Sequence, residues 1–518
     1  MEYPIPSYFE LTGDSRLDSL THGYYWALGE NRTVDWSVSG GLAGGTSTVT
    51  WINPSQMQQP VASHLAKISS YADIRFNFVG YFDSPVEAHA AGSEINIAPS
   101  GLLEMFSGVG ALARGFFPKS DADAQFYVGE AGDIFLNSKN NSIDELTFGT
   151  PGTSGWWLYM HELGHTLGLK HPHDTGGTGR PTLGGLYGYD IDLLSVMTYP
   201  SNAYFESGGP STPLLLDVLA LQYLYGPNMA TNAEDSMLQL YSTGDYRTHW
   251  DAGGFDCVTA LGSGEGWYIS LPEVPCFSLV DTKVGLAMPI ADTWLEFPQT
   301  MIWLAGDYEV AQGSEFDDDI FANDFDNLIE GCGGNDHLEG MDGIDSALYA
   351  SSSTAYQIQY DELAQGYLVM GPAEVDALRT IERVIFADKR VAIDLQGNAG
   401  VAVKLLGALA GPSAAHDAHY IGFVLALLDD DITPSFVAQA ALDILLGPAR
   451  TSVDVVDLMY QMIAGIAAPQ GDRDYYKSLL DTQVVSEADF VIAASQLELN
   501  LDHIGYAGMV NDGVEYLL

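Results

Sequence analysis

The feature that most constrains this chain is the eleven-residue segment HELGHTLGLKH at 161–171. Its functional positions are His161, Glu162, His165, Gly168 and His171. Residues four apart share one face of an α-helix, so the first two histidines can direct their imidazoles at one metal ion. The glycine lets the helix stop and the chain turn, which brings the third histidine round as another nitrogen ligand. We therefore predict a helix over 154–169 that leads into a three-histidine metal site.

The residue types of this motif point to hydrolytic zinc chemistry. Three imidazoles that leave one coordination position open to water are typical of catalytic zinc. The ion lowers the pKa of water towards about 7 and polarises a carbonyl group. Glu162 follows the first ligand, near enough to accept a proton from water without being a ligand, so we expect it to be the general base. An amphipathic helix with unrelated surface histidines is the alternative, and the full spacing disfavours it.

A second segment, SVMTYP at 195–200, agrees with such a site. A methionine in a tight turn beneath three histidines would give them a polarizable apolar floor, and Met197 is that residue. Tyr199 could reach the metal or an oxyanion with its phenol. Without the histidine motif, Met197 would be interpreted as a core residue and Tyr199 as a surface aromatic.

Together, HELGHTLGLKH and SVMTY resemble the metzincin metalloproteases and, among them, the serralysins, which are secreted bacterial endopeptidases. DSLTHGYYW (18–26) is similar to their N-terminal helix, and TPLLLDVLALQYLYGPN (212–228) to their closing helix. The resemblance covers most of residues 15–395. It implies an α+β protease domain, built from a twisted mixed sheet and the active-site helix.

The resemblance also implies roles for single residues. Zinc would bind His161, His165 and His171, and Glu162 would be the general base. Tyr199 would ligate resting zinc and swing away to stabilise the tetrahedral intermediate. The chain departs from the family at two positions. Lys170 stands where a small residue is usual, and we expect its charge to weaken metal binding slightly; His173 stands where glycine is common, and we interpret it as a loop histidine.

Strands and helices are expected at several places in the first part of the chain. The predicted strands are TVTWIN (48–53), DIRFNFVGYF (73–82), SEINIA (93–98) and GDIFLN (132–137), and a helix is predicted over 60–72. A substrate polypeptide would lie antiparallel to an edge strand above the active-site helix, and GDIFLN is the candidate for that strand.

Residues 313–348 divide into four acidic nonapeptides, GSEFDDDIF, ANDFDNLIE, GCGGNDHLE and GMDGIDSAL. The eighth position is apolar in each, and the pattern is typical of parallel β-rolls that bind calcium. The predicted calcium ligands are Gly331, Gly333, Asp336, Gly340, Asp342 and Asp345. Phe316 and Phe325 replace glycines in the first two repeats, so we doubt full occupancy there. A plain β domain with acidic turns is the alternative.

A further calcium site is implied by resemblance alone. WDAGGFD (250–256) is similar to a serralysin segment that binds calcium where the protease domain meets the roll. This similarity nominates Asp251, Gly253 and Asp256 as ligands.

The composition changes along the chain predict three domains. They are a zinc protease domain over 1–228, a calcium-binding β-roll or β-sandwich domain over 229–395, and an all-α domain of about six short helices over 396–518. The helical domain could bind a surface or a protein partner, belong to a secretion signal, or serve packing. It resembles helical modules of unknown function in other bacterial exoproteins.

Charge and segment composition bear on partners and location. The net charge of −50 repels phosphate backbones, so we expect no nucleic-acid partner. No apolar run is long enough for a transmembrane helix, and the N-terminus lacks the pattern of a signal peptide. Calcium-dependent folding outside the cell would suit type I secretion from a Gram-negative bacterium. We expect an extracellular monomer; Cys257 and Cys276 could pair or remain free thiols.

The function that follows is a secreted zinc endopeptidase that hydrolyses proteins and is stabilised by calcium. The alternative is a calcium-dependent surface or adhesion protein whose protease domain is vestigial. That alternative predicts zinc binding without turnover.

Overall fold

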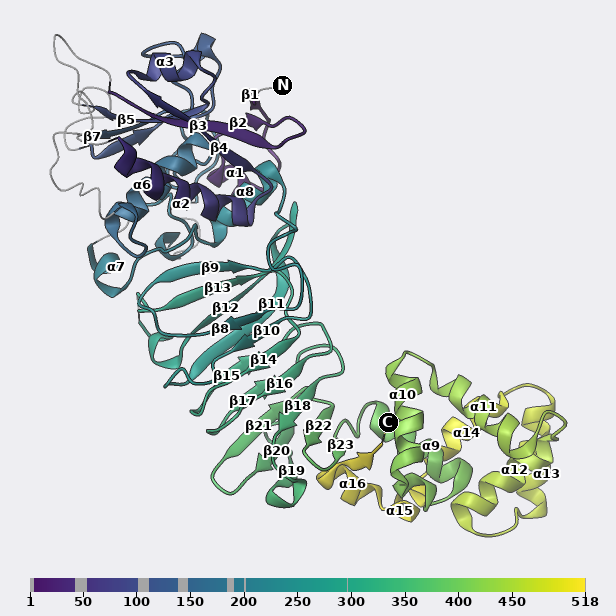
Figure 1. Cartoon of the computed structure of the whole chain (residues 1–518). Helices are drawn as coiled ribbons and strands as arrows, with labels where there is room; N and C mark the ends of the chain where they lie inside the picture. The colour runs from purple at the N-terminus through teal and green to yellow at the C-terminus, as the bar shows by residue number, and fades with distance from the viewer. Residues whose placement is uncertain are drawn as a thin grey trace. The chain divides into compact units, whose positions relative to one another are not determined.

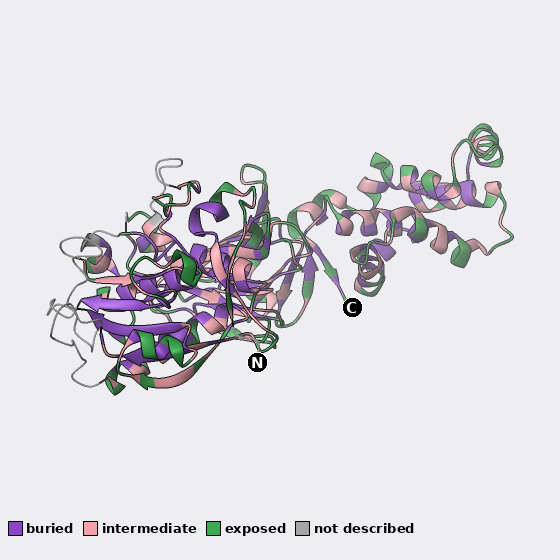
Figure 2. Ribbon diagram, turned by 90° about the horizontal axis from the view of Figure 1, so that it is seen from above, coloured by how far each residue is buried: buried purple, intermediate pink, exposed green. Residues whose placement is uncertain are grey.

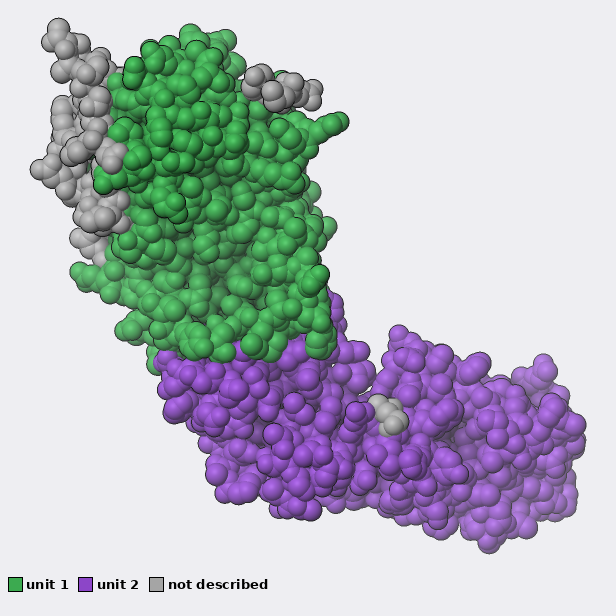
Figure 3. Space-filling model, viewed as in Figure 1, with its two compact units in different colours: residues 1–258, 268–308 green, residues 259–267, 309–518 purple. Residues whose placement is uncertain are grey.

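The computed structural model describes residues 4–41, 54–100, 111–137, 148–183, 191–199, 202–295 and 297–517. The chain forms two compact units, residues 1–258 with 268–308 and residues 259–267 with 309–518 (Figure 3). The division into three domains at 228 and 395 stays a prediction, and the strand predicted at 48–53 lies outside the described residues. None of the described helices has both the length and the apolar character needed to cross a membrane.

The first unit contains a five-stranded sheet, of which Figure 1 labels β3, β4, β5 and β7. Its strand order is β4-β3-β5-β7-β6. Its strands are β3 (Thr33–Ser39), β4 (Arg75–Phe82), β5 (Ile95–Ser100), β6 (Ala113–Gly115) and β7 (Ile134–Asn137). All run parallel except β6, which is antiparallel to β7. β5 and β7 are buried along their whole length, as expected for parallel strands covered on both faces. The strands predicted at 73–82, 93–98 and 132–137 are confirmed.

The predicted edge strand is wrong. GDIFLN contains β7, which has a neighbour on each side, and the edge strand next to β7 is β6. β6 has three residues, Ala-Arg-Gly, and so shows no alternation of apolar and polar side chains. The pattern by which strands are found in sequences cannot detect an element this short.

The first unit also contains helices. They are α1 (Ser15–Leu20), α2 (Ser55–Tyr71), α3 (Pro85–Ala90), α6 (Ser154–Thr166), α7 (Asn202–Ser207) and α8 (Leu215–Tyr225). Of these, α2, α3 and α6 contact the five-stranded sheet. Helix α2, predicted from residue 60, begins five residues earlier and turns Val61, Leu65 and Ile68 into the core. Spacings of three and four residues place these side chains on one face. α6 and α8 are buried on most sides, which puts the histidine motif inside the first unit.

Further strands complete the first unit. β1 (Ile5–Tyr8) pairs antiparallel with β2 (Tyr24–Ala27), and helix α1 lies between them in the sequence. Later strands are β8 (Met237–Gln239), β9 (Tyr246–Trp250), β10 (Cys257–Thr259), β11 (Trp267–Phe277), β12 (Val280–Pro289) and β13 (Met301–Ala305). β12 is antiparallel to β13, and β13 is parallel to β9.

The second unit opens with the acidic repeats, which form two parallel sheets. Successive strands are β14 (Val310–Gln312), β15 (Asp319–Phe321), β16 (Leu328–Glu330), β17 (His337–Glu339) and β18 (Ser346–Tyr349). Each pairs in parallel with the strand two repeats away, as Val310 with Leu328 and Asp319 with His337. The chain therefore alternates between the sheets. The eighth positions, Ile320, Ile329, Leu338 and Ala347, are all buried between them, in the predicted register.

The roll continues through further strands before the helices begin. The strands are β19 (Gln357–Asp361), β20 (Gly366–Met370), β21 (Val375–Arg379), β22 (Arg383–Phe386) and β23 (Arg390–Ala392). β21 and β22 pair in parallel with β17 and β18, and antiparallel strands extend both sheets. The helices are α9 (Asn398–Ala410), α10 (Ala418–Asp429), α11 (Pro434–Leu446), α12 (Ser452–Met459), α13 (Gln470–Asp481), α14 (Glu487–Ser495), α15 (Glu498–His503) and α16 (Tyr506–Asp512). These eight helices of the described tail alternate buried and exposed faces around one core (Figure 2). The chain then returns as β24 (Val514–Tyr516), antiparallel to β23.

The burial of the repeat core can be tested in the roll. Leu338 has 1% of its surface exposed, whereas Leu363, on the β19–β20 hairpin, is 97% exposed. Because Leu338→Ala leaves a cavity, we expect it to lower the free energy of unfolding by about 2–5 kcal/mol in denaturant titrations with calcium. The matched control Leu363→Ala should change it by less than about 0.5 kcal/mol. Equal effects would contradict the core assignment.

Candidate metal centre

Helix α6 carries the first two motif histidines. The hydroxyl of Thr153 caps the helix by accepting a hydrogen bond from Trp156 N–H at 3.2 Å. The helix ends at Thr166, three residues before the predicted end, because Gly168 takes a φ of +97°. A Cβ at this position would strike the carbonyl oxygen of Tyr24, so the turn requires glycine.

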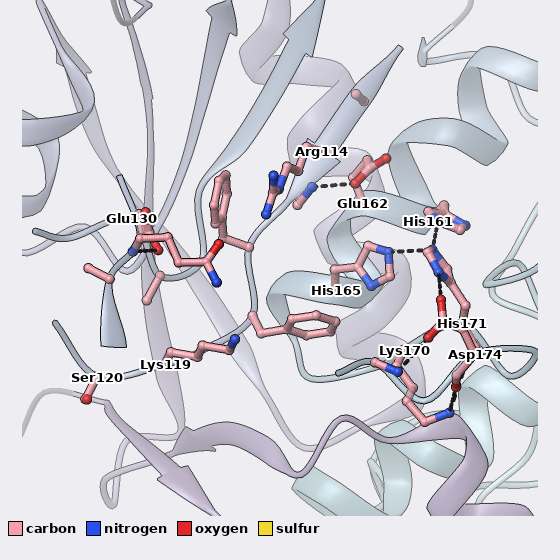
Figure 4. A pocket seen from close by; sticks show the side chains of 18 of the residues that line it. Arg114, Lys119, Ser120, Glu130, His161, Glu162, His165, Lys170, His171 and Asp174 are labelled. Atoms are coloured by element: carbon pink, nitrogen blue, oxygen red, sulfur yellow. Dashed lines mark hydrogen bonds and ion pairs between the residues drawn. The ribbon is translucent and has the colours of Figure 1, made fainter. Parts of the chain in front are cut away.

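The three motif histidines converge on one point (Figure 4). Nε2 of His171 lies 3.0 Å from Nε2 of His161 and 3.0 Å from Nε2 of His165. One ligand atom from each ring lies within 4.8 Å of the others. The structure thus brings together the residues that the sequence nominates as metal ligands.

The second nitrogen of each ring determines which tautomer is present. Each Nδ1 faces an acceptor: the carbonyl of Val196 at 2.8 Å from His161, the carbonyl of Leu169 at 2.9 Å from His165, and the carboxylate of Asp174 at 2.7 Å from His171. Each Nδ1 must therefore carry the proton, which leaves the three Nε2 lone pairs free. Histidines that bind zinc are commonly held in this way through their outer N–H.

The donor set fits zinc. Burial lowers the pKa of His161 to about 3 and places that of His165 well below its usual value, so both rings are neutral at pH 7. Three neutral imidazole nitrogens beside an open cavity are the ligand set of a catalytic zinc site. Asp174 is a residue that the sequence analysis missed. Its place three residues after the last ligand, in a loop, is a signal that could have found it.

Glu162 lies on the same helix but does not join the histidine cluster. It is buried, and its Oε2 accepts a hydrogen bond from the main-chain N–H of Gly115 on β6. A Cβ at Gly115 would strike the carbonyl oxygen of Glu162, so glycine permits this close approach of strand and helix. Burial raises the pKa of Glu162 to about 7, and the Gly115 hydrogen bond and the Arg114 guanidinium oppose the shift. A carboxyl group in this range can both accept and release a proton.

Tyr199 lies two residues after Met197 and contacts the histidine cluster. Its hydroxyl lies 2.9 Å from Nε2 of His171, and its ring stacks on His161 with centroids 5.5 Å apart. The residue is 63% exposed, so the phenol stands at the mouth of the site. His173 stacks on His171 at 5.1 Å between centroids and remains a loop histidine beside the cluster.

Met197, which the sequence analysis predicts to form a floor beneath the histidines, packs against α6 at Gly164. It is buried, and its side chain packs where a Cβ on Gly164 of α6 would stand. The turn around it is held by Asp217, a buried residue of α8 that the sequence analysis missed. The carboxylate accepts hydrogen bonds from Ser195 Oγ at 2.6 Å and from Val196 N–H at 2.8 Å. The carbonyl of Val196 accepts the hydrogen bond from Nδ1 of His161, so Asp217 helps to position this nominated ligand by way of Val196.

A cavity of about 450 Å³ opens beside the three histidines and Glu162 (Figure 4). Arg114 and Gly115 of the edge strand line one wall, and Phe117 and Lys119 continue it. Asp174 and Tyr199 line the side of the cluster. The volume lies within the usual range of binding pockets, and the cavity brings a main-chain edge close to the metal position.

Lys170, expected to weaken metal binding, points away from the histidine cluster. The residue is fully buried, and its ammonium group donates hydrogen bonds to main-chain carbonyl oxygens. Burial lowers the pKa of Lys170 to about 8, and the nearby Asp174 carboxylate opposes the shift.

Of the nominated calcium ligands, those of WDAGGFD lie together. Asp251 and Asp256 are both buried, and Ser236 contacts both, through Oγ to Asp251 at 2.8 Å and through N–H to Asp256 at 2.6 Å. Gly253 has a φ of +131°, and its N–H donates to Asp251 at 3.2 Å. Burial raises the pKa of Asp251 to about 6, and the neighbouring Asp256 carboxylate adds to this shift. Such a pair suits a divalent cation.

The roll places the aspartates of the repeats in ladders. Asp336 accepts a hydrogen bond from Asp318 N–H at 2.9 Å, and Asp345 accepts one from Asn327 N–H at 2.8 Å. Oδ2 of Asp345 is buried and has no hydrogen-bond partner among the described residues, which fits a cation ligand. Gly331 and Gly340 are required for space, because a Cβ on either would strike an aspartate oxygen.

Other positions of the ladders differ from expectation. Asp342 is exposed, and Gly333 is half-buried near Glu315. Two ladder residues were missed: Asp376 and Glu382 accept the N–H groups of Asp336 at 3.1 Å and Asp345 at 2.8 Å. In the first repeat the hydroxyl of Ser314 donates a hydrogen bond to the Asp318 carboxylate at 3.0 Å. A side chain of the protein therefore already contacts this carboxylate.

The outer-nitrogen contact of His171 generates a prediction. Asp174→Ala removes the acceptor that fixes this ring, so we expect the zinc dissociation constant to rise about 10–100-fold. The measurement is competition against a chromophoric chelator, and exposed Asp83→Ala is the control. Unchanged affinity in Asp174→Ala would show that the carboxylate does not orient the ligand.

Known proteins resemble part of this chain. No protein-family model matches it. Metalloprotease AprA of Pseudomonas entomophila is 35% identical over 161 residues, which are 26% of this chain and 33% of that protein. Serralysin of Proteus mirabilis is 36% identical over 140 residues, 23% of this chain and 28% of that protein. Serralysin of Photorhabdus sp. (strain Az29) is 25% identical over 283 residues, 50% of this chain and 52% of that protein.

The chain thus spans about a third to a half of the length of these relatives. The names agree with the resemblance carried by the histidine motif and the methionine turn. Over the residues that these matches cover, the chain is similar to serralysins and to the metalloprotease AprA.

Proposed function

We propose that this chain is a secreted zinc-dependent endopeptidase that hydrolyses proteins. The observation that carries the proposal is the convergence of three imidazole Nε2 atoms beside a buried glutamate at one end of an open cavity. The names of the relatives, serralysin and metalloprotease, support the same chemistry. Zinc, when bound by His161, His165 and His171, would supply Lewis-acid chemistry and lower the pKa of water.

The edge strand β6 would align the substrate. An edge strand offers main-chain N–H and C=O groups, to which an extended polypeptide can add as a further antiparallel strand. β6 is held against α6 by the contact between Gly115 and Glu162. A peptide paired with β6 would therefore pass over the histidine cluster with a carbonyl group near Glu162.

The side chains then have distinct proton-transfer roles. Glu162 takes a proton from the attacking water, whose oxygen bonds to the carbonyl carbon of the scissile peptide. The Tyr199 phenol donates a hydrogen bond to the oxyanion of the tetrahedral intermediate. When the C–N bond breaks, Glu162 passes its proton to the leaving amine and returns to the carboxylate form.

Calcium would stabilise the fold at the two carboxylate clusters. The buried pair Asp251 and Asp256 and the ladders that contain Asp336 and Asp345 are the proposed sites. Because these carboxylates repel one another without a cation, folding would await the calcium found outside the cell. Secretion by a type I route, a monomeric state and a binding role for the helical tail are parts of the same proposal.

The role of Glu162 can be tested by isosteric replacement. Glu162→Gln removes the base but no ligand, so zinc binding should remain while casein hydrolysis with calcium falls at least about 100-fold. Exposed Glu87→Gln is the control and should keep full activity. Equal activity of native protein and Glu162→Gln would contradict the assigned base. Zinc-loaded native protein without any turnover would favour the adhesion alternative.

The carboxylate ladders predict a pH dependence in chelator. Burial raises the pKa of Asp336 and of Asp345 to about 8 in the calcium-free fold. Their unfolded pKa is about 3.9, so the folded state binds protons more tightly. The resulting stabilisation is complete below about pH 4 and is lost as the pH rises to about 8. We expect the free energy of unfolding in chelator to fall from pH 5 to pH 8, and calcium to restore it at pH 8.

A variant separates this effect from the net charge. Asp345→Asn should be more stable than the native protein in chelator at pH 8 and should respond less to calcium. Exposed Asp502→Asn removes the same charge elsewhere and should leave the calcium response unchanged. Identical responses of both variants would rule out the proposed calcium site at Asp345.

A further inference from the structure

The position of the third histidine needs an explanation that the helix does not provide. His161 and His165 are held by α6, but residues 170–183 contain neither helix nor strand. Ordering each residue of such a loop costs backbone conformational entropy. A preformed ligand on this loop therefore requires specific anchoring contacts.

Lys170 supplies those contacts. Its side chain is completely buried, and its ammonium group points into a cage of main-chain carbonyl oxygens. The four acceptors are the carbonyls of Ser19 at 2.5 Å, Asp174 at 2.7 Å, His171 at 3.1 Å and Pro181 at 3.1 Å. They come from α1 and from both ends of the loop, so one charge joins three parts of the chain.

The cage is continuous with the metal ligand. The carbonyl oxygen of Asp174 accepts a hydrogen bond from Lys170 at 2.7 Å. Its carboxylate accepts one from Nδ1 of His171, also at 2.7 Å. The same carboxylate accepts Gly176 N–H at 2.6 Å. A displacement of the ammonium group would therefore move the residue that orients the imidazole.

The remainder of the loop is anchored by a second buried cation. Arg180 is 2% exposed and donates to the carbonyl of Phe9 at 2.5 Å and to the carboxylate of Asp18 at 3.3 Å. Nε2 of His22 lies 3.0 Å from the carbonyl of Gly176. Arg180 has a carboxylate partner, whereas the four hydrogen-bond acceptors of Lys170 are all main-chain carbonyl oxygens.

We propose that Lys170 is a positioning residue of the metal site, acting as an internal cation that holds the His171 loop in ligating geometry. An ammonium group is a compact charge, and four carbonyl oxygens make the kind of shell that a bound metal cation would otherwise occupy. The proposal rests on the proposed zinc function, and it reverses the expectation that a lysine here weakens metal binding.

Zinc affinity tests the proposal directly. Lys170→Met keeps most of the side-chain volume and removes the charge, so the zinc dissociation constant at pH 7 should rise about 10–100-fold in chelator competition. Exposed Lys67→Met removes one charge from the same unit and should bind zinc as the native protein does. A native protein that binds no zinc would overturn the proposed function. Native and Lys170→Met proteins with equal zinc affinity would overturn this inference alone, even if the variant melts at a lower temperature.

Chemical rescue separates positioning from a general loss of stability. Lys170→Ala leaves the carbonyl cage open to a small cation, so ammonium chloride should restore much of the lost zinc affinity. Choline chloride at equal ionic strength carries a cation too bulky for the cage and should not. Equal effects of the two salts would contradict an internal-cation role. If Lys170→Met does not fold, Lys170→Ala prepared in ammonium chloride and exchanged into choline chloride gives the same comparison.

Discussion

The site depends on one constraint: three neutral imidazoles must offer their lone pairs to the same point. That arrangement is stable only if each ring is held by its other nitrogen. Two main-chain carbonyls and the carboxylate of Asp174 perform this function, and they come from three different segments. The methionine turn, the turn at Gly168 and the loop after it are therefore parts of one support. Asp217 holds the first segment, whereas Lys170 and Arg180 hold the last.

Buried charge also matters in the roll, where the buried groups are anions rather than cations. In the loop that carries His171, buried carbonyl and carboxylate oxygens accept hydrogen bonds from two buried cations, Lys170 and Arg180. The whole chain has only 19 lysines and arginines. In the roll, Asp336 and Asp345 are buried beside other carboxylates, and burial together with this repulsion raises their pKa values. In a fold with a net charge of −50, the divalent cations of the proposed function would offset the repulsion between these buried groups.

Features with a fixed local period could be predicted from the sequence. The spacing of His161 and His165 reports a helix turn, and the nine-residue period of the roll places Ile329 and Leu338 in its core. Contacts formed only in the tertiary fold could not be predicted. The edge strand β6 is too short for a pattern, and Asp376 and Glu382 continue the ladders only after an inserted hairpin interrupts the repeat. The direction of the Lys170 side chain was equally inaccessible, because spacing in the sequence does not say where a long side chain ends.

Zinc K-edge X-ray absorption on the dialysed protein tests the central claim most directly, because it reports the ligand atoms themselves. Our account predicts one zinc ion per chain, surrounded by three imidazole nitrogens at about 2.0–2.1 Å and completed by oxygen. A spectrum with sulfur ligands, with fewer than three imidazoles, or with no stoichiometric zinc would contradict it.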